Sequence, residues 1–189
     1  MKIYEPDIYK IERIGGEDKL LTLPRIEHAL IIGTLHSIIN MNISDKYIVF
    51  ADCISIKFDE ENIFVPDLTV IKKSSIIKGK VEGMPKLVVE VWSLSNKPAE
   101  REKKLEIYAR KGIPQFIEID YLKREVVSNK LIDGAYQIVK KIDVYPLYEY
   151  EIEDVLNKVD HGITIECVQM KVDMLDVFNN DIKNYIPYR

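Results

Sequence analysis

The run from Leu87 to Trp92 constrains the fold of this chain more than any other feature, because it places an acid in the middle of an apolar strand. It reads LVVEVW. Side chains alternate between the two faces of a sheet along a strand, so Glu90 shares its face with Trp92 while the opposite face is wholly apolar. A charged side chain in such a run is costly unless it is paired or bound to a metal. The run therefore predicts a buried strand whose carboxylate needs a partner.

A second acid interrupts a second apolar run upstream. Asp67 lies in IFVPDLTVI, which covers residues 63–71. Hard cations such as Mg²⁺ prefer oxygen ligands and often use one or two protein carboxylates, with water and substrate phosphate completing the shell. Asp67 and Glu90 on two core strands thus indicate a divalent-cation site. Each acid also has a structural interpretation, since Asp67 can cap a turn after Pro66 and Glu90 can form a buried ion pair, for example with Lys104.

The pattern along the rest of the chain predicts an α/β core. Apolar spacing and turn residues predict helices over 27–41, 98–111 and 174–178, and strands over 47–58, 63–71, 87–92, 115–120 and 163–168. A further hairpin is expected around Asp133 and Gly134. Because a helix connects the strands at 87–92 and 115–120, these two strands should be parallel. No repeat, low-complexity segment or linker is evident, so residues 1–189 are expected to form one domain.

Composition narrows the class of protein. The net charge of −4 argues against a protein that coats nucleic acid, although a local basic groove remains compatible with it. The lysines at 72, 73, 78, 80 and 86 either contact phosphate or form a solvated loop. Two cysteines without CxxC spacing argue against a zinc site or a disulfide framework. Residues 1–7 lack the apolar core of a secretion signal and residues 29–41 are too short to cross a bilayer, so a cytoplasmic location without membrane contact is expected.

The sequence lacks a lysine at the position where the common nuclease pattern has one. The common nuclease pattern has a lysine two residues after the second acid, but Trp92 stands at that position. On the predicted helix, Glu100, Lys104 and Tyr108 are spaced i, i+4, i+8 and share one face, from which Lys104 can reach back toward the strand of Glu90. The alternative is an exposed Glu100–Lys104 surface pair, with Tyr108 packed in the core.

Taken together, these segments resemble the Uma2 family of restriction-endonuclease-like proteins, which belongs to the PD-(D/E)xK nuclease superfamily. The resemblance covers roughly residues 28–120. It rests on PDL at 66–68, LVVEVWSLS at 87–95, EREKKLEIY at 100–108, GIP at 112–114 and FIEID at 116–120. The sequence departs from the family pattern at Leu94, where proline is usual, and at Glu100, where aspartate is usual.

The resemblance implies a fold and a site. The fold is a restriction-endonuclease-like three-layer α/β core, with a central mixed β-sheet flanked by helices and extra β-hairpins. In the site, Asp67 and Glu90 bind Mg²⁺ or Mn²⁺, with the backbone carbonyl of Val91 as a further ligand. Lys104 takes the place of the missing strand lysine. Residues of the first helix complete the site in some superfamily members, which points to Glu27 or to His28. Taken by itself, His28 is more typical of a structural histidine.

The expected function is that of a metal-dependent DNA endonuclease. The metal held by Asp67 and Glu90 activates water for in-line attack on a phosphodiester. Lys104 stabilises the developing charge or orients the nucleophile, and Glu100 assists Lys104. A homodimer is expected, because cutting both strands of a duplex usually needs two active sites. Two alternatives stay open: a nuclease acting on RNA or on branched DNA, and a catalytically silent nuclease-fold domain that binds nucleic acid or protein.

Overall fold

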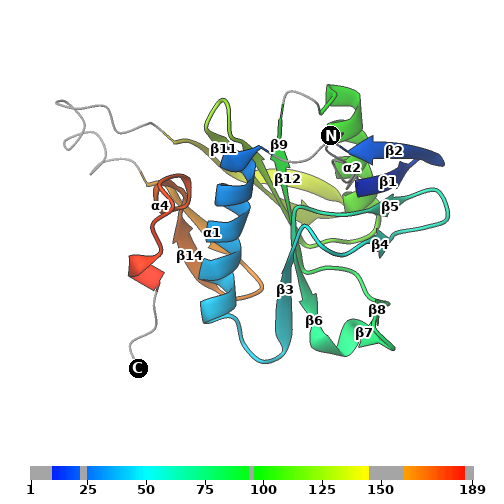
Figure 1. The fold of residues 1–189 in the computed structure, drawn as a ribbon, viewed down its shortest axis with the longest axis horizontal. Helices are drawn as coiled ribbons and strands as arrows, with labels where there is room; N and C mark the ends of the chain where they lie inside the picture. Colours follow the sequence, from blue (N-terminus) through cyan, green and yellow to red (C-terminus); the bar gives the residue numbers. More distant parts are fainter. Residues whose placement is uncertain (1–9, 22–24, 94–95, 145–159, 186–189) are drawn as a thin grey trace, which may run out of the picture.

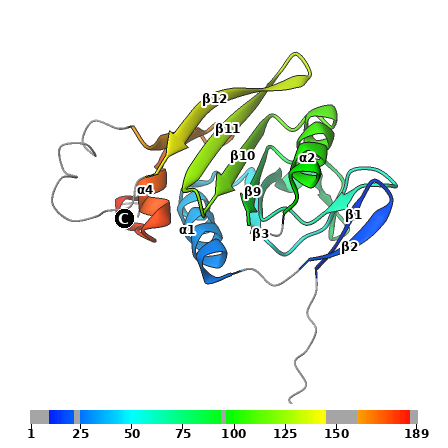
Figure 2. The ribbon, with the colours of Figure 1, turned by 90° about the horizontal axis from the view of Figure 1, so that it is seen from above.

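A six-stranded mixed sheet forms the centre of the protein, with helices on both faces (Figure 1, Figure 2). The computed structural model describes residues 10–21, 25–93, 96–144 and 160–185. In sheet order, the strands are β12 (Ala135–Asp143), β11 (Glu125–Ile132), β10 (Gln115–Asp120), β9 (Leu87–Trp92), β6 (Leu68–Lys72) and β3 (Tyr47–Ala51). Helices α1 (Ile26–Asn42) and α2 (Pro98–Arg110) cover opposite faces. The expected three-layer arrangement is confirmed.

Strand β9 lies inside the sheet and is buried along its whole length. It runs parallel to β10 and antiparallel to β6, as expected from the helical connection between β9 and β10. Leu87 and Val89 pack into the core beneath α1, whereas Val88 and Trp92 pack into the core beneath α2. The predicted alternation is therefore confirmed, and Glu90 faces α2. Residues 94 and 95, at the end of the motif that resembles Uma2, lie outside the described residues.

Helix α2 begins and ends where local chemistry predicts. Pro98 occupies its first turn, where a missing N–H costs nothing. Gly112 follows the helix with φ of 73°, a left-handed conformation that glycine adopts without strain. The buried side chains of the helix are those of Lys104, Ile107 and Tyr108. Its buried stripe therefore contains a lysine.

Helix α1 matches its predicted span to within one residue at each end and packs through an apolar stripe on the other face of the sheet. The described chain from residue 160 onward adds to this layer. It contains β13 (Gly162–Ile165), β14 (Met170–Asp173), α4 (Met174–Phe178) and the short η2 (Lys183–Tyr185). Their apolar side chains join those of α1 in one core.

The predicted hairpin of residues 47–58 and 63–71 is divided between two sheets. Its outer halves pair as β3 and β6 in the central sheet. Its inner halves, β4 (Ile56–Lys57) and β5 (Ile63–Phe64), join β1 (Lys10–Ile14) and β2 (Glu17–Leu21) in a second sheet with the order β2-β1-β5-β4. Two residues account for the division. Asp52 has φ of 54°, which breaks the strand, and Pro66 has no N–H to donate to a continuous ladder.

The remaining turns follow the expected chemistry. Asp133 and Gly134, both with positive φ, connect β11 to β12 as a two-residue turn. The basic segment after β6 contains η1 (Lys73–Ser75) and a small hairpin of β7 (Ile76–Ile77) and β8 (Lys80–Val81). No helix within the described residues is both long and apolar enough to span a membrane.

Candidate active site

Asp67 and Glu90 lie side by side on neighbouring antiparallel strands. Leu68 pairs with Val89, and continuing this register by one residue places Asp67 opposite Glu90. The backbone N–H of Val91 donates to Asp67 Oδ2 at 2.8 Å, which ties the Asp67 side chain to β9. Glu90 is 2% exposed and Asp67 is 9% exposed. The structure therefore brings together the two acids that the sequence singled out.

Lys104 reaches Glu90 from helix α2. Its Nζ lies 3.1 Å from Glu90 Oε1 and 3.3 Å from Oε2, and its side chain is buried. The Tyr108 hydroxyl, one turn further along the helix, donates to Glu90 Oε1. The helix face shared by Lys104 and Tyr108 thus points at Glu90. This is the geometry expected of a lysine that has moved from the strand to the helix.

Glu12, on β1, is a third acid in the site and was not predicted from the sequence. It is 1% exposed, and its Oε2 lies 2.9 Å from Lys104 Nζ. Its Oε1 accepts from the Val65 N–H at 2.8 Å. A weak signal for it exists in the sequence, because alternation along β1 places Glu12 on the same face as the buried Ile14. The short polar stretch around it hides this alternation.

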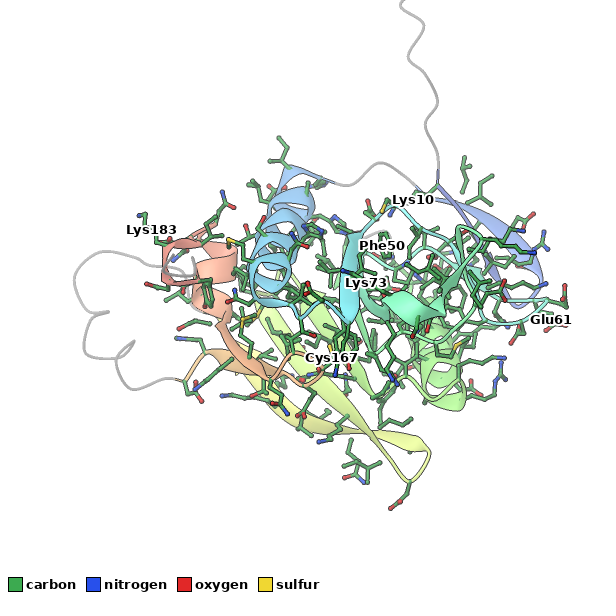
Figure 3. The ribbon with its side chains drawn as sticks, turned by 90° about the horizontal axis from the view of Figure 1, so that it is seen from below. Lys10, Phe50, Glu61, Lys73, Cys167 and Lys183 are labelled. Carbon is green, nitrogen blue, oxygen red and sulfur yellow. The ribbon has the colours of Figure 1, made fainter. Side chains whose placement is uncertain are left out.

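Two basic side chains lie close to the Asp67 carboxylate. His28 Nε2, near the start of α1, lies 3.2 Å from Asp67 Oδ2. Lys10 Nζ lies 3.8 Å from Asp67 Oδ1 and also pairs with Asp52; Figure 3 labels Lys10 at the start of β1. Of the two first-helix candidates, His28 is therefore at the site, whereas Glu27 is exposed.

Glu100 has a different partner from the expected one. Its carboxylate pairs with Lys19 on β2, so this contact joins helix α2 to the β1–β2 hairpin. The i, i+4 spacing from Lys104 does not bring Glu100 into the cluster, because Lys104 turns inward to Glu90 and Glu12.

The lysine-rich loop lies at the other end of β9. Lys86 immediately precedes the strand and Glu90 is four residues further on, roughly 13 Å at the rise of a strand. Lys73, labelled in Figure 3, lies in this loop and is exposed. These lysines do not line the acid cluster.

Comparisons with known proteins identify the family of the chain. A family model for Uma2, described as a putative restriction endonuclease, matches residues 1–150. This match covers most of the chain. The protein belongs to the Uma2 family. No curated protein matches the Uma2 chain at a significant level.

The fold of the Uma2 chain is similar to one solved by crystallography. That structure is a putative nuclease belonging to DUF820 from Anabaena variabilis ATCC 29413, with a TM-score of 0.71 over 90% of both chains. The two sequences are 17% identical, so the likeness concerns the fold. Family and fold together confirm the resemblance inferred from the motifs, and they support a nuclease function in general terms.

The acid cluster of the Uma2 chain shifts the pKa of its members. Burial is the main cause that raises the pKa of Glu90, to about 8; the charge of Lys104 opposes this shift, whereas the charges of Asp67 and Glu12 act in the same direction as burial. Burial disfavours the charged form of Lys104, but the charges of Glu90 and Glu12 raise its pKa well above the ordinary value. Lys104 is therefore protonated at neutral pH, whereas Glu90 gains or loses its proton at a pH close to neutral.

Asp67 behaves differently from Glu90. Burial acts to raise its pKa, but the hydrogen bond and charge of His28 and the N–H of Val91 lower it below the ordinary value. Asp67 is therefore ionised under conditions in which Glu90 holds a proton. Neighbouring carboxylates whose surroundings separate their pKa values in this way are typical of functional sites.

The cluster fits a hard divalent cation in the chemistry of its donors. Asp67 and Glu90 supply carboxylate oxygens, and a bound cation would favour the ionised form of Glu90. Within the described part of the chain, no three His, Cys, Asp or Glu side chains are arranged to hold a metal by themselves. Two carboxylates completed by backbone carbonyl, water and phosphate are what Mg²⁺ commonly uses.

Proposed function

We propose that this protein is a metal-dependent DNA endonuclease of the PD-(D/E)xK type, in which the catalytic lysine is on helix α2. One observation carries the proposal. The buried ammonium of Lys104 lies 3.1 Å from Glu90 Oε1, and Asp67 lies opposite Glu90 on the neighbouring strand. Membership of the Uma2 family and the nuclease fold support it. DNA is the proposed substrate because the family is described as a putative restriction endonuclease.

Asp67, Glu90 and the Val91 carbonyl would hold Mg²⁺ or Mn²⁺ in this proposal. When bound, such an ion supplies an activated water and neutralises charge on the phosphate. The protein itself holds the two acids side by side on neighbouring strands. The N–H of Val91 and the ring of His28 keep Asp67 ionised and oriented toward Glu90.

Lys104 acts as an electrostatic stabiliser in this mechanism. Because its pKa is raised, Lys104 stays protonated at neutral pH and cannot act as a general base when it contacts both carboxylates. An ammonium donates to anionic oxygens, so Lys104 would donate to a phosphoryl oxygen as negative charge builds up there. Its position between Glu90 and Glu12 places it beside the proposed metal ligands.

Glu100 assists Lys104 indirectly in this proposal. The Glu100–Lys19 pair holds helix α2 against the β1–β2 hairpin. That hairpin carries Glu12, which contacts Lys104. Glu100 therefore acts on the relative position of helix α2 and the β1–β2 hairpin.

We also propose that the protein acts as a homodimer on duplex DNA, because each chain carries one such site for one strand.

The first experiment is cleavage of plasmid DNA, single-stranded DNA and RNA by purified protein with Mg²⁺, Mn²⁺ or EDTA. The variants are Glu90→Gln, Asp67→Asn and Lys104→Met, and Lys103→Met is a matched control because Lys103 is exposed on the same helix. We expect metal-dependent DNA cleavage, a loss of at least about 100-fold in the three site variants, and near-wild-type rates in the control. Equal rates for Lys104→Met and Lys103→Met would contradict the role of Lys104.

A catalytically silent binding module is the second candidate. It is favoured by the fact that Lys104 already pairs with both Glu90 and Glu12 without a metal, which is an arrangement that can serve structure alone. Folded wild-type protein that binds nucleic acid or protein but cleaves no substrate would support this candidate. Preferential cleavage of RNA or branched DNA would instead keep the nuclease and change its substrate.

A further inference from the structure

Glu12 connects two parts of the site that are far apart in the sequence. One oxygen accepts from the Val65 N–H at 2.8 Å, two residues before Asp67. The carboxylate also contacts the Lys104 ammonium, at 2.9 Å from Oε2 and 3.0 Å from Oε1. The side chain of Glu12 therefore contacts both the segment that carries Asp67 and the ammonium of Lys104.

The Val65 contact restrains the backbone close to Asp67. Pro66, between them, has no N–H, so Val65 has the nearest backbone donor on the N-terminal side of Asp67. On the other side, the Asp67 side chain is held by the Val91 N–H. Glu12 on β1 and Val91 on β9 thus restrain the segment around Asp67 from two different strands, at the point where the chain passes from one sheet to the other.

The buried ammonium of Lys104 contacts two carboxylates, those of Glu12 and Glu90. Each buried charge carries a desolvation cost of several kcal/mol, which only a partner offsets. A second carboxylate becomes useful when Glu90 binds a cation and no longer holds Lys104, because Glu12 then keeps the ammonium in place.

We propose that Glu12 is a positioning residue that holds the Lys104 ammonium beside the acids and fixes the backbone leading to Asp67. This inference rests on the proposed nuclease function and deepens it by assigning a role to the β1–β2 hairpin. The reacting atoms are contacted by Lys104 and by the metal ligands, and Glu12 acts through them. Such supporting residues typically contribute about 10- to 100-fold to activity.

The hairpin has other attachments, so the contacts of Glu12 can be removed without releasing it. Ile14 packs in the core beneath α2. The Gly15 N–H donates to Asn62 Oδ1 at 3.0 Å, and the Gly16 N–H donates to the Glu61 carbonyl at 2.8 Å. Glu12→Gln keeps the length of the side chain and an oxygen that can accept from Val65, but removes its charge. We therefore expect this variant to fold.

The test is NMR of protein labelled with ¹⁵N-lysine, with the Lys104 Nζ resonance assigned through Lys104→Met. A buried ammonium held by carboxylates should give a resolved, slowly exchanging signal. We expect this signal to be lost or strongly shifted in Glu12→Gln. It should be unchanged in Asp18→Asn, a matched acid on the same hairpin that pairs outward with the exposed Arg13. An unchanged Lys104 signal in folded Glu12→Gln would overturn the proposal.

A second variant keeps the test decisive if Glu12→Gln does not fold. In Glu90→Gln, Glu12 should still hold Lys104, so the resolved signal should persist; its loss there would contradict a positioning role. In cleavage assays, Glu12→Gln should lower kcat by about 10- to 100-fold with KM within about twofold. If the wild-type protein cleaves nothing, the nuclease proposal fails, whereas the NMR signals still decide whether Glu12 positions Lys104.

Discussion

At the scale of single residues, the site is a small set of charges removed from water. Glu12, Glu90 and Lys104 are each buried, and the ammonium lies between the two carboxylates. Charges in such surroundings persist only when each one is compensated, because desolvation costs several kcal/mol per ion. Within this set, the proton on Glu90 is the component that changes with pH, since burial raises its pKa to about 8.

This shift predicts how stability depends on pH in the absence of metal. The folded state keeps a proton on Glu90 up to about pH 8, whereas the unfolded chain releases it near the ordinary glutamate pKa of 4.5. The folded state therefore binds more protons between these values, and stability falls as pH rises from about 5 to 8. Thermal unfolding in EDTA across this range should show the decline in wild type. In Glu90→Gln the decline should be much weaker, and an identical slope would contradict the assignment.

At the scale of elements, the site depends on two sheets and a helix meeting at one place. The central sheet supplies Asp67 and Glu90, helix α2 supplies Lys104, and the second sheet supplies Glu12. The division of the predicted hairpin at Asp52 and Pro66 makes this possible, because it turns β4 and β5 away from the central sheet and toward β1. Figure 1 shows β1 and β2 beside α2.

The Glu100–Lys19 pair should couple the hairpin to helix α2 by a modest amount. Both side chains are about a quarter exposed, with 25% for Glu100 and 29% for Lys19. Partly exposed pairs of this kind contribute about 0.2–1 kcal/mol. Glu100→Gln, Lys19→Met and the double variant form a cycle in which urea unfolding should give a coupling energy in this range. The same cycle measured on kcat should also show coupling; additive effects on both quantities would contradict the indirect role of Glu100.

At the scale of the whole molecule, the protein combines the Uma2 family and a nuclease fold with a buried cluster of three carboxylates and a lysine. Because the net charge of the chain is −4, the DNA binding that we propose requires a local basic surface rather than a protein that is basic as a whole. Lys10 and His28 beside Asp67 are basic groups close to the acids, whereas the lysines before β9 are at the far end of that strand.

Metal binding should therefore be visible as stabilisation of the whole fold. A cation that binds the folded state alone, at 100 times its Kd, raises the free energy of unfolding by about 2.7 kcal/mol. Titration with Mn²⁺ should raise the Tm of wild-type protein and of the Lys103→Met control. Asp67→Asn combined with Glu90→Gln should abolish the increase. An equal increase in the double variant would place the bound cation elsewhere.

The sequence by itself determined the parts of this protein that depend on local periodicity and on motifs. Alternation in β9 identified Glu90 as a buried acid, and helical spacing placed Lys104 and Tyr108 on one face. Both inferences use residues within one element, where backbone geometry dictates side-chain direction. The parallel pairing of β9 and β10 followed in the same way from the helix between them.

Only the tertiary structure decided which distant side chains complete the site. Glu12 contacts Lys104 across 92 positions of sequence, and Glu100 pairs with Lys19 across 81. No short-range pattern specifies such contacts, because they depend on how separate elements pack after each has formed. The approach of His28 to Asp67 has the same origin, since it requires the start of α1 to meet the end of a strand on another part of the chain.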